Sequence, residues 1–361
     1  MMHAHTDWRQ VGVVAGSYLA LLVGGAFATG QEAIQFFVAY GAYGFLGLAL
    51  CCLAMIYMSW SFLSAGRREK FSTNEEVFRY FCGDSAGKVV TWYTIIMIIA
   101  VYGVMLSGIA ATLEQAYGIP ASYGAGLMAL CCMTTALLGL NRIVRFLGFV
   151  GPLVVIFTLI TAIGALFNSA IDLKAGLQAS REIAFLKVSN SWWISCFLYV
   201  GLATPGLAGF LPLVGATMAG GREVNAVAVV GPVLFIGALA ILTFVLITHV
   251  TMVHAAEVPL MTIAINVSPL YGSVFGAVIF LGIYTTVTPM LWTICRRFAA
   301  ENSFLYRILI VGITLICWIG GGLIPFGKLV NWIYPSVGYV GLFIVSCQIY
   351  RDIKRWRTTS S

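Results

Sequence analysis

The chain has 361 residues, of which 60% are hydrophobic and only 9% are charged. Soluble domains average about 25% charged and about 45–50% apolar residues. This composition excludes a soluble enzyme, a disordered chain and a nucleic-acid-binding protein, and it indicates an integral membrane protein.

Charge-free stretches indicate how often the chain crosses the bilayer. Ten windows of 20 or more residues contain no Lys, Arg, Asp or Glu. A transmembrane helix needs about 20 apolar residues, and the windows lack the polar–apolar alternation of barrel strands. The sequence therefore predicts an all-α membrane protein, a single domain over residues 1–361, with ten transmembrane helices. In chain order, the predicted crossings are 11–40, 43–64, 89–113, 122–140, 146–168, 191–218, 224–250, 268–297, 304–323 and 328–350.

Three connections have features of their own. Residues 66–88 are predicted to carry a short amphipathic helix, because Thr73 is followed three residues later by Glu76 in a capping-box pattern. Residues 169–190 form the longest outer connection. Residues 255–266 are predicted to form a short helix at the outer surface.

The distribution of positive charge predicts the orientation. With the N-terminus in the cytoplasm, 16 of the 20 Lys and Arg residues lie on the cytoplasmic side of these crossings. Positive charge favours that side, and an even number of crossings returns the C-terminus to it. We expect a bacterial plasma-membrane (inner-membrane) protein with both termini inside. The nine cysteines are interpreted as small hydrophobic residues, without a disulfide or a metal site.

Two crossings contain Gly-rich segments followed by a signal for a new helix. In the first crossing, Gly24 and Gly25 precede Thr29 and Glu32, which are spaced as a capping box. In the sixth, Thr204-Pro205 has the form of an N-cap followed by proline at the first helical position. The pattern predicts that both crossings are two half-helices. The alternative is that the glycines only allow close helix packing.

The two predicted breaks lie about half the chain apart, in the first and sixth of ten crossings. This spacing predicts a 5+5 inverted repeat, with one half at about 11–168 and the other at about 191–350. Paired broken helices at corresponding positions indicate a mid-membrane substrate site in secondary transporters.

The segment from Gly24 to Glu32 reads Gly-Gly-Ala-Phe-Ala-Thr-Gly-Gln-Glu. With ten crossings and this length, the chain resembles an amino-acid permease family of small ten-helix bacterial membrane proteins, within the amino acid–polyamine–organocation (APC) superfamily. The resemblance implies a LeuT-type fold with discontinuous helices 1 and 6, and a substrate between crossings 1, 3, 6 and 8.

Half-helix ends expose amides that favour anions and carbonyls that favour cations. The amides near Gly25 and the carbonyls near Val200 therefore suit the two charges of an amino acid, although a betaine or a small organic anion would fit part of the site. The predicted substrate-binding residues are Gly24, Gly25, Ala26, Thr29, Glu32, Tyr102, Tyr199, Val200, Gly201 and Thr204.

Glu32 is the one acidic residue well inside an apolar stretch. A charge at that depth is a candidate functional residue. It could carry a proton, contact a substrate amine or contact a cation, or it could only cap its helix. Tyr102 is placed in the site because a tyrosine on crossing 3 contacts substrate in several relatives; the alternative is packing.

In sodium-coupled relatives, hydroxyls of crossing 8 and carbonyls of crossing 1 hold Na⁺. The resemblance places such a cation site at Leu21, Leu22, Gly24, Gly282, Thr285 and Thr286. Crossing 5 contains no lysine, the residue that fills this place in some sodium-independent relatives. The alternative is that the threonines bond back to their own helix. Na⁺ is favoured as coupling ion and H⁺ stays open; no other metal or cofactor is expected.

The sequence therefore predicts a secondary symporter for an amino acid or a similar small solute, working by alternating access in the lipid bilayer. A ligand receptor of the same fold, as in spore germination, is the alternative. No catalytic residues are identified, so an enzyme is not expected, and neither is a nucleic-acid partner.

Overall fold

A computed structural model describes residues 7–138, 144–168, 172–218, 220–301 and 303–359. The described residues are almost entirely helical. The helices are α1 (Trp8–Leu22), α2 (Gly25–Thr29), α3 (Gln31–Phe36), the 3-10 helix η1 (Val38–Tyr40), α4 (Ala42–Glu69), α5 (Asn74–Cys82), α6 (Asp84–Tyr117), α7 (Ala121–Leu138), α8 (Val144–Asn168), α9 (Leu173–Glu182), α10 (Trp192–Gly215), α11 (Gly221–Thr248), α12 (Val250–Val253), α13 (Pro259–Val267), α14 (Pro269–Phe298), α15 (Phe304–Leu323) and α16 (Phe326–Thr359).

Within the described residues, nine helices are long and apolar enough to cross a membrane. They correspond to the second to tenth predicted crossings. The first crossing is made of shorter pieces, because α1 has only 15 residues and the chain continues through α2, α3 and η1. The predicted interruption of the first crossing is therefore confirmed. The two repeat boundaries stay predictions.

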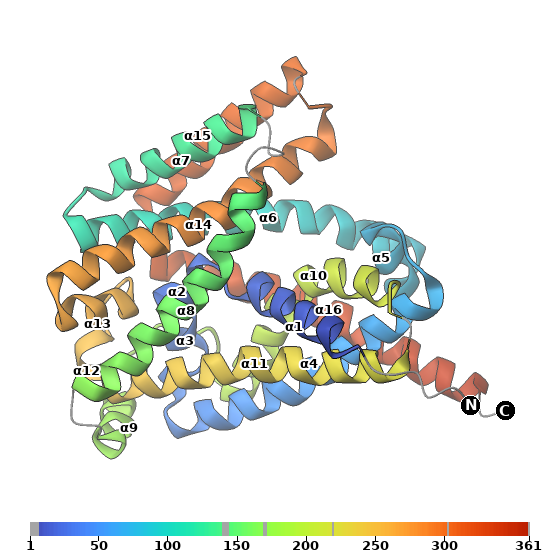
Figure 1. Cartoon of the computed structure of the whole chain (residues 1–361), viewed down its shortest axis with the longest axis horizontal. Helices are drawn as coiled ribbons and strands as arrows, with labels where there is room; N and C mark the ends of the chain where they lie inside the picture. Colours follow the sequence, from blue (N-terminus) through green and yellow to red (C-terminus); the bar gives the residue numbers. More distant parts are fainter. Residues whose placement is uncertain (1–6, 139–143, 169–171, 219, 302, 360–361) are drawn as a thin grey trace.

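The long helices pack in two groups. In one group, α4 packs against α10 and α11, and α11 packs against α1. In the other, α6, α7, α14 and α15 pack against each other. Figure 1 shows α7 and α15 at the edge of the molecule farthest from α4 and α11. α8 and α16 each contact both groups, so the groups are joined but separately packed.

The two ends of the bundle differ. Figure 1 shows α5 and the end of α16 at one end, and α9, α12 and α13 at the other. Arg297, in the last turn of α14, pairs with Glu75 of α5 at 3.7 Å, so α14 also ends there. We refer to these as the α5 end and the α13 end; the α5 end is the one predicted to be cytoplasmic.

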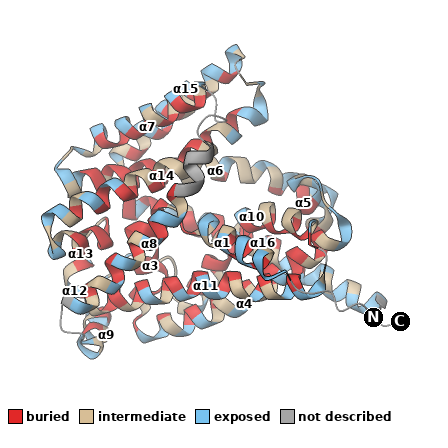
Figure 2. Cartoon of the chain, in the orientation of Figure 1, coloured by how far each residue is buried: buried red, intermediate tan, exposed pale blue. Residues whose placement is uncertain are grey.

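Burial follows the requirements of a bilayer. Figure 2 shows buried residues where helices face each other and exposed residues on their outward faces. Many of the outward residues are large and apolar, such as Leu130 on α7 and Ile316 on α15. Lipid chains can cover such side chains, whereas a water-soluble protein rarely leaves large apolar patches exposed.

The sixth crossing differs from its prediction. α10 is one continuous α-helix, not two half-helices. Pro205 lacks an N–H and cannot donate to the carbonyl of Gly201. Thr204 does not act as an N-cap; its hydroxyl donates to the carbonyl of Val200 at 2.8 Å, within the same helix.

The packing of α10 against α16 explains why residue 201 of α10 is a glycine. A Cβ atom on Gly201 would overlap the carbonyl oxygen of Gly338, and a Cβ atom on Gly341 would overlap the carbonyl oxygen of Gly201. The glycines therefore allow these two backbones to touch. At this crossing the alternative interpretation, close packing, accounts for the motif.

Two predicted surface helices are present. α5 is capped by Thr73, whose hydroxyl accepts from the amide of Glu76 at 3.3 Å. The short helix predicted at 255–266 corresponds to α13, which starts later, at Pro259. All nine cysteines are free thiols, five buried and four partly buried, which agrees with their interpretation as small hydrophobic residues.

Candidate functional site

The break in the first crossing lies at Val23 and Gly24. α1 ends at Leu22, Gly24 is extended (φ −94°, ψ −173°), and α2 begins at Gly25. The interruption leaves carbonyls at the end of α1 and amides at the start of α2 without intrahelical partners. A second bend follows at Gly30, where φ is 82°, and α3 begins at Gln31. The chain therefore presents two sets of free backbone groups deep in the bundle.

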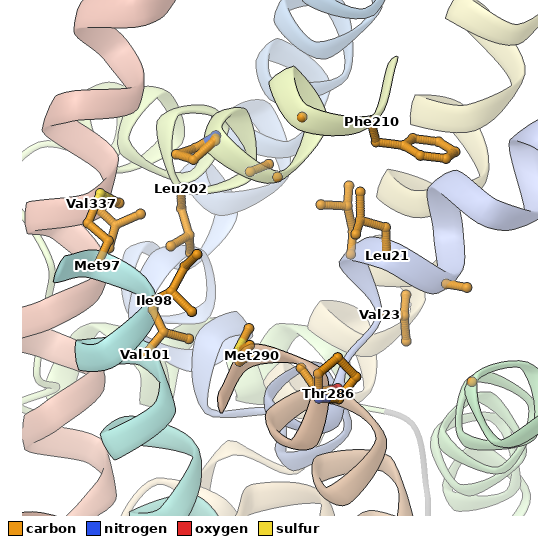
Figure 3. Close-up of a pocket in the computed structure, with 18 of the residues that line it drawn as sticks. Leu21, Val23, Met97, Ile98, Val101, Leu202, Phe210, Thr286, Met290 and Val337 are labelled. Carbon is orange, nitrogen blue, oxygen red and sulfur yellow. The ribbon is translucent and has the colours of Figure 1, made fainter. Parts of the chain in front are cut away.

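A cavity of about 750 Å³ lies beside this break, between the two helix groups. Figure 3 shows its apolar walls: Leu21 and Val23 from the first crossing face Met97, Ile98 and Val101 of α6 across the space. Further lining residues are Leu202, Phe210, Phe235, Met290 and Val337. The volume and apolar lining are typical of a small-molecule site.

Among the described residues that line the cavity, Glu32 supplies the one acidic group, and there is no Lys or Arg. Glu32 lies on α3 and is only 9% exposed. The hydroxyl of Tyr199 donates to its Oε2 at 3.3 Å. Neither of the two ion pairs found among the described residues includes Glu32. A buried carboxylate without a cationic partner favours a proton or a positively charged ligand.

Glu32 does not form the predicted capping box. The hydroxyl of Thr29 accepts from the amide of Gln31 at 3.2 Å, one residue earlier than predicted, and donates to the carbonyl of Ala26 at 2.6 Å. Gly30, without a side chain, is the N-cap of α3. The Glu32 carboxylate is thus aimed at Tyr199 and the cavity.

An aromatic cluster holds Tyr199 in place. Its ring lies edge-on to Phe36 and to Phe37, with centroids 5.1 Å apart in each pair. It stacks on Phe235 of α11 at 6.2 Å. Because the ring is packed on three sides, its hydroxyl is fixed toward Glu32. Tyr334 of α16 also lines this part of the cavity.

The residues of the predicted cation site lie close together. Leu21, Leu22, Gly282, Thr285 and Thr286 all line the cavity. A Cβ atom on Gly24 would lie 3.4 Å from Oγ1 of Thr286, so the break and α14 are in contact. Both threonine hydroxyls donate to the carbonyl of Gly282 at 2.9 Å, the alternative arrangement. Their oxygen lone pairs stay available to a cation.

The other predicted residues divide into two sets. Gly25, Ala26 and Thr29 are buried in α2 but do not line the cavity; a Cβ atom on Gly25 would overlap Ile283. Val200, Gly201 and Thr204 also lie outside the lining, because α10 turns Leu202, Ala203 and Pro205 to the cavity and Gly201 to α16.

Tyr102 is fully buried and does not line the cavity, so the structure favours packing for this residue. Asn74, Phe235 and Tyr334 line the cavity but were not predicted from the sequence. They come from α5, α11 and α16, and no motif marks them; only their position in the bundle brings them to the cavity.

The cavity reaches the surface at the α5 end. Asn74, at the start of α5, is exposed and lines the cavity. Thr94, Gly209 and Thr293 also line the cavity. These last three lie toward the ends of α6, α10 and α14 that meet α5. The cavity therefore extends from Glu32 to the α5 end.

On the α13 side, polar contacts surround Gly327, in the first turn of α16. No described residue of α9, α12 or α13 lines the cavity. Glu257, between α12 and α13, accepts from its amide at 2.6 Å. Gln35 of α3 donates to its carbonyl at 2.7 Å and accepts from Asn331 at 3.2 Å. We call Gln35, Glu257, Gly327 and Asn331 the Gly327 latch. It joins α3, the α12–α13 connection and α16.

Solved structures with the same arrangement are transporters of one fold. An inward-facing structure of Mhp1 has a TM-score of 0.59 at 14% identity, covering 90% of this chain and 75% of that chain. MhsT in complex with L-phenylalanine has a TM-score of 0.59 at 14% identity, with coverage of 94% and 88%. A mutant of the Eremococcus coleocola manganese transporter has a TM-score of 0.59 at 14% identity, with coverage of 95% and 78%. The chain is an all-α membrane protein with the LeuT fold.

Two sequence relatives come from Bacillus subtilis. The chain is 22% identical to the uncharacterized membrane protein YkvI over 344 residues, which is 94% of this chain and 96% of YkvI. It is 24% identical to the uncharacterized protein YyaD over 348 residues, with coverage of 94% and 96%. No family model matches the sequence. The amino-acid permease family stays a resemblance.

Proposed function

We propose that this protein is a secondary active transporter for a small solute that carries an amine and an apolar body, such as an apolar amino acid. The observation that carries the proposal is the Glu32 carboxylate, which has no cationic partner among the described residues and lies in a largely apolar cavity at a broken helix. A substrate ammonium would supply the missing positive charge, and the apolar walls would accept the rest of the molecule.

The packing supports alternating access. The cavity lies between two helix groups and reaches the α5 end, whereas at the α13 end the Gly327 latch joins three elements and no described residue of α9, α12 or α13 lines the cavity. Rocking one group against the other would move the opening from one end to the other around a fixed site. MhsT, which has the same fold, binds L-phenylalanine, and an aromatic amino acid would also suit this cavity.

We propose the region of Gly24, Thr285 and Thr286 as the site of the coupling ion. Free carbonyls at the end of α1 and two hydroxyls on α14 provide only oxygen ligands, which suit a hard cation such as Na⁺. Glu32 is the alternative carrier if the coupling ion is H⁺. With the positive charge of the chain gathered at the α5 end, we propose that this end is cytoplasmic and that the protein lies in the bacterial plasma membrane.

The test is uptake into proteoliposomes under imposed Na⁺ and H⁺ gradients. Three labelled probes separate the requirements: L-phenylalanine, phenethylamine, which keeps the amine, and 3-phenylpropionate, which lacks it. Glu32→Gln keeps the shape and removes the charge. We expect loss of amine uptake by at least about 30-fold, because removing one member of a buried charge pair costs about 2–5 kcal/mol.

The matched control is Glu114→Gln, which neutralises an exposed carboxylate on α6 that does not line the cavity. It should transport like the wild type. Uptake of 3-phenylpropionate in preference to the two amines would contradict the proposed role of Glu32. Saturable binding without flux under either gradient would show a ligand receptor instead.

A further inference from the structure

A second hollow, of about 470 Å³, lies at the α13 end, well away from the transport cavity. It is bounded by η1, the start of α4, α9 and the segment that leads into α10. The lining residues are Ala39, Tyr40, Tyr43, Ser180, Arg181, Lys187, Asn190, Ser191, Trp192 and Trp193. In contrast to the first cavity, charged and polar side chains form much of its wall.

The charge of this hollow is positive. Arg181 and Lys187 both line it, and no acidic side chain is among the described residues of its wall. Neither cation takes part in an ion pair among the described residues. The Nζ atom of Lys187 lies 5.5 Å from the centre of the Tyr40 ring, which holds the cation at the rim. Two unpaired cations over one hollow favour an anionic ligand.

The start of α10 adds backbone donors to the same wall. Ser191 is the N-cap of this 24-residue helix, and its side chain makes no hydrogen bond to the first turn. The first-turn amides of α10 therefore lack a side-chain acceptor beside Arg181 and Lys187. Helix N-termini favour phosphate and other anions. The cations, the amides and the exposed Asn190 side chain provide donors for a phosphate group.

The aromatic residues place the hollow at the depth of lipid headgroups. Tyr43 and Trp192 stack with ring centroids 6.0 Å apart and an interplanar angle of 16°. Tyr43 is 58% exposed and Trp193 is 51% exposed, at the ends of two membrane-crossing helices. Exposed Trp and Tyr at helix ends are typical of the membrane–water interface. A phospholipid in this leaflet could place its phosphate in the hollow.

Tyr40 and Gly41, at the connection between the first two crossings, contact the segment from α9 to α10. We call this connection the joint. The Tyr40 hydroxyl donates to the carbonyl of Ser189 at 2.6 Å. Gly41, with φ of 58°, turns the chain into α4, and a Cβ atom there would lie 3.0 Å from Oγ of Ser180. A ligand that bridged Arg181 and Lys187 would fasten α9 and the following segment over this joint.

We propose that the hollow lined by Arg181 and Lys187 binds the phosphate-containing headgroup of an anionic phospholipid in the leaflet at the α13 end. Binding stabilises the segment from α9 to α10 against the joint at Tyr40 and Gly41. This site is independent of the substrate cavity and of the proposed transport activity.

The test uses the full-length purified protein in detergent. Dioleoylphosphatidylglycerol is titrated while the thermal midpoint is followed, with dioleoylphosphatidylcholine as the zwitterionic comparison. The Arg181→Gln/Lys187→Gln double variant removes both charges at exposed positions, so the fold should be kept. We expect phosphatidylglycerol to raise the thermal midpoint of the wild type. The double variant should need at least a tenfold higher concentration of this lipid for the same rise. Binding to the folded state raises apparent stability in this way.

The control is Lys174→Gln, an exposed cation on α9 that does not line the hollow. It should respond to phosphatidylglycerol like the wild type; an equal loss in this variant would show a general charge effect and overturn the site. Glycerol 1-phosphate forms a third arm. Stabilisation by this free phosphate at the same concentrations as the lipid would overturn a lipid ligand. Equal stabilisation by phosphatidylcholine would also overturn it.

Discussion

The Gly327 latch makes the strongest prediction about the conformational equilibrium. Glu257 accepts from the backbone amide of Gly327 at 2.6 Å, in the first turn of α16. We expect opening at the α13 end to break this bond, because it connects the α12–α13 segment to α16. Glu257→Ala removes the acceptor and should favour opening at this end.

The expected size of the effect follows from the type of bond. A hydrogen bond to a charged group contributes about 1.5–3 kcal/mol. An acidic group at a helix N-terminus adds about 0.3–1 kcal/mol. A loss of about 2 kcal/mol corresponds to about a 30-fold increase in the population of the open state, since about 1.4 kcal/mol is a factor of ten. Glu257→Gln keeps an acceptor but loses the charge, so its effect should be smaller.

Hydrogen–deuterium exchange of the reconstituted protein measures this population. The amides to follow are those of α3, because α3 makes its own contact to the latch through Gln35. Their exchange should be about 30-fold faster in Glu257→Ala, since exchange through local opening follows the open population. Glu114→Ala, which removes an exposed carboxylate on α6, should leave it unchanged. If only the Gly327 amide exchanged faster, while the amides of α3 exchanged as in the wild type, the proposed role of the latch in opening this end would be refuted.

Three further predictions concern the cavity and the packing. Thr285→Ala with Thr286→Ala should raise the Na⁺ concentration for half-maximal uptake by about tenfold if these hydroxyls are ligands; an unchanged Na⁺ response would remove them from the ion site. A thiol reagent that cannot cross the membrane should modify Phe210→Cys from the α5 side of oriented vesicles, because this residue lines the open part of the cavity; modification from the other side only would contradict that direction. Gly201→Ala should destabilise the protein by about 1–3 kcal/mol, seen as a lower thermal midpoint, because its Cβ would overlap a carbonyl of α16. Gly206→Ala, whose Cβ would lie 4.0 Å from its nearest neighbour, is the matched control and should be neutral.

Much of the fold was predictable because membrane insertion depends on local composition. Hydrophobic length alone predicts the crossings, and each long helix of the structure corresponds to one of them. The break at Gly24 was also predictable, since glycines precede a new helix signal and Glu32 follows at a depth where charge is costly.

The similar signal at Thr204-Pro205 led to a wrong prediction for α10. The reason is that a glycine in a membrane helix has two uses, to break the helix or to let another backbone approach, and the local sequence does not distinguish them. The neighbour decides: Gly338 of α16 packs directly on Gly201, and α10 stays helical. Tyr102 shows the same limit, because its helix turns it into the core and away from the cavity.

Membrane location, the long apolar helices and the interruption of the first one can be read from the sequence, because they depend on hydrophobicity and backbone freedom within a few consecutive residues. Which side chains meet at Glu32 and which end of the cavity reaches the surface depend on how distant helices pack, and the sequence does not contain this information locally. Tyr199 lies far from Glu32 along the chain and Gly327 lies far from Gln35, and the packing of helices alone brings each pair together.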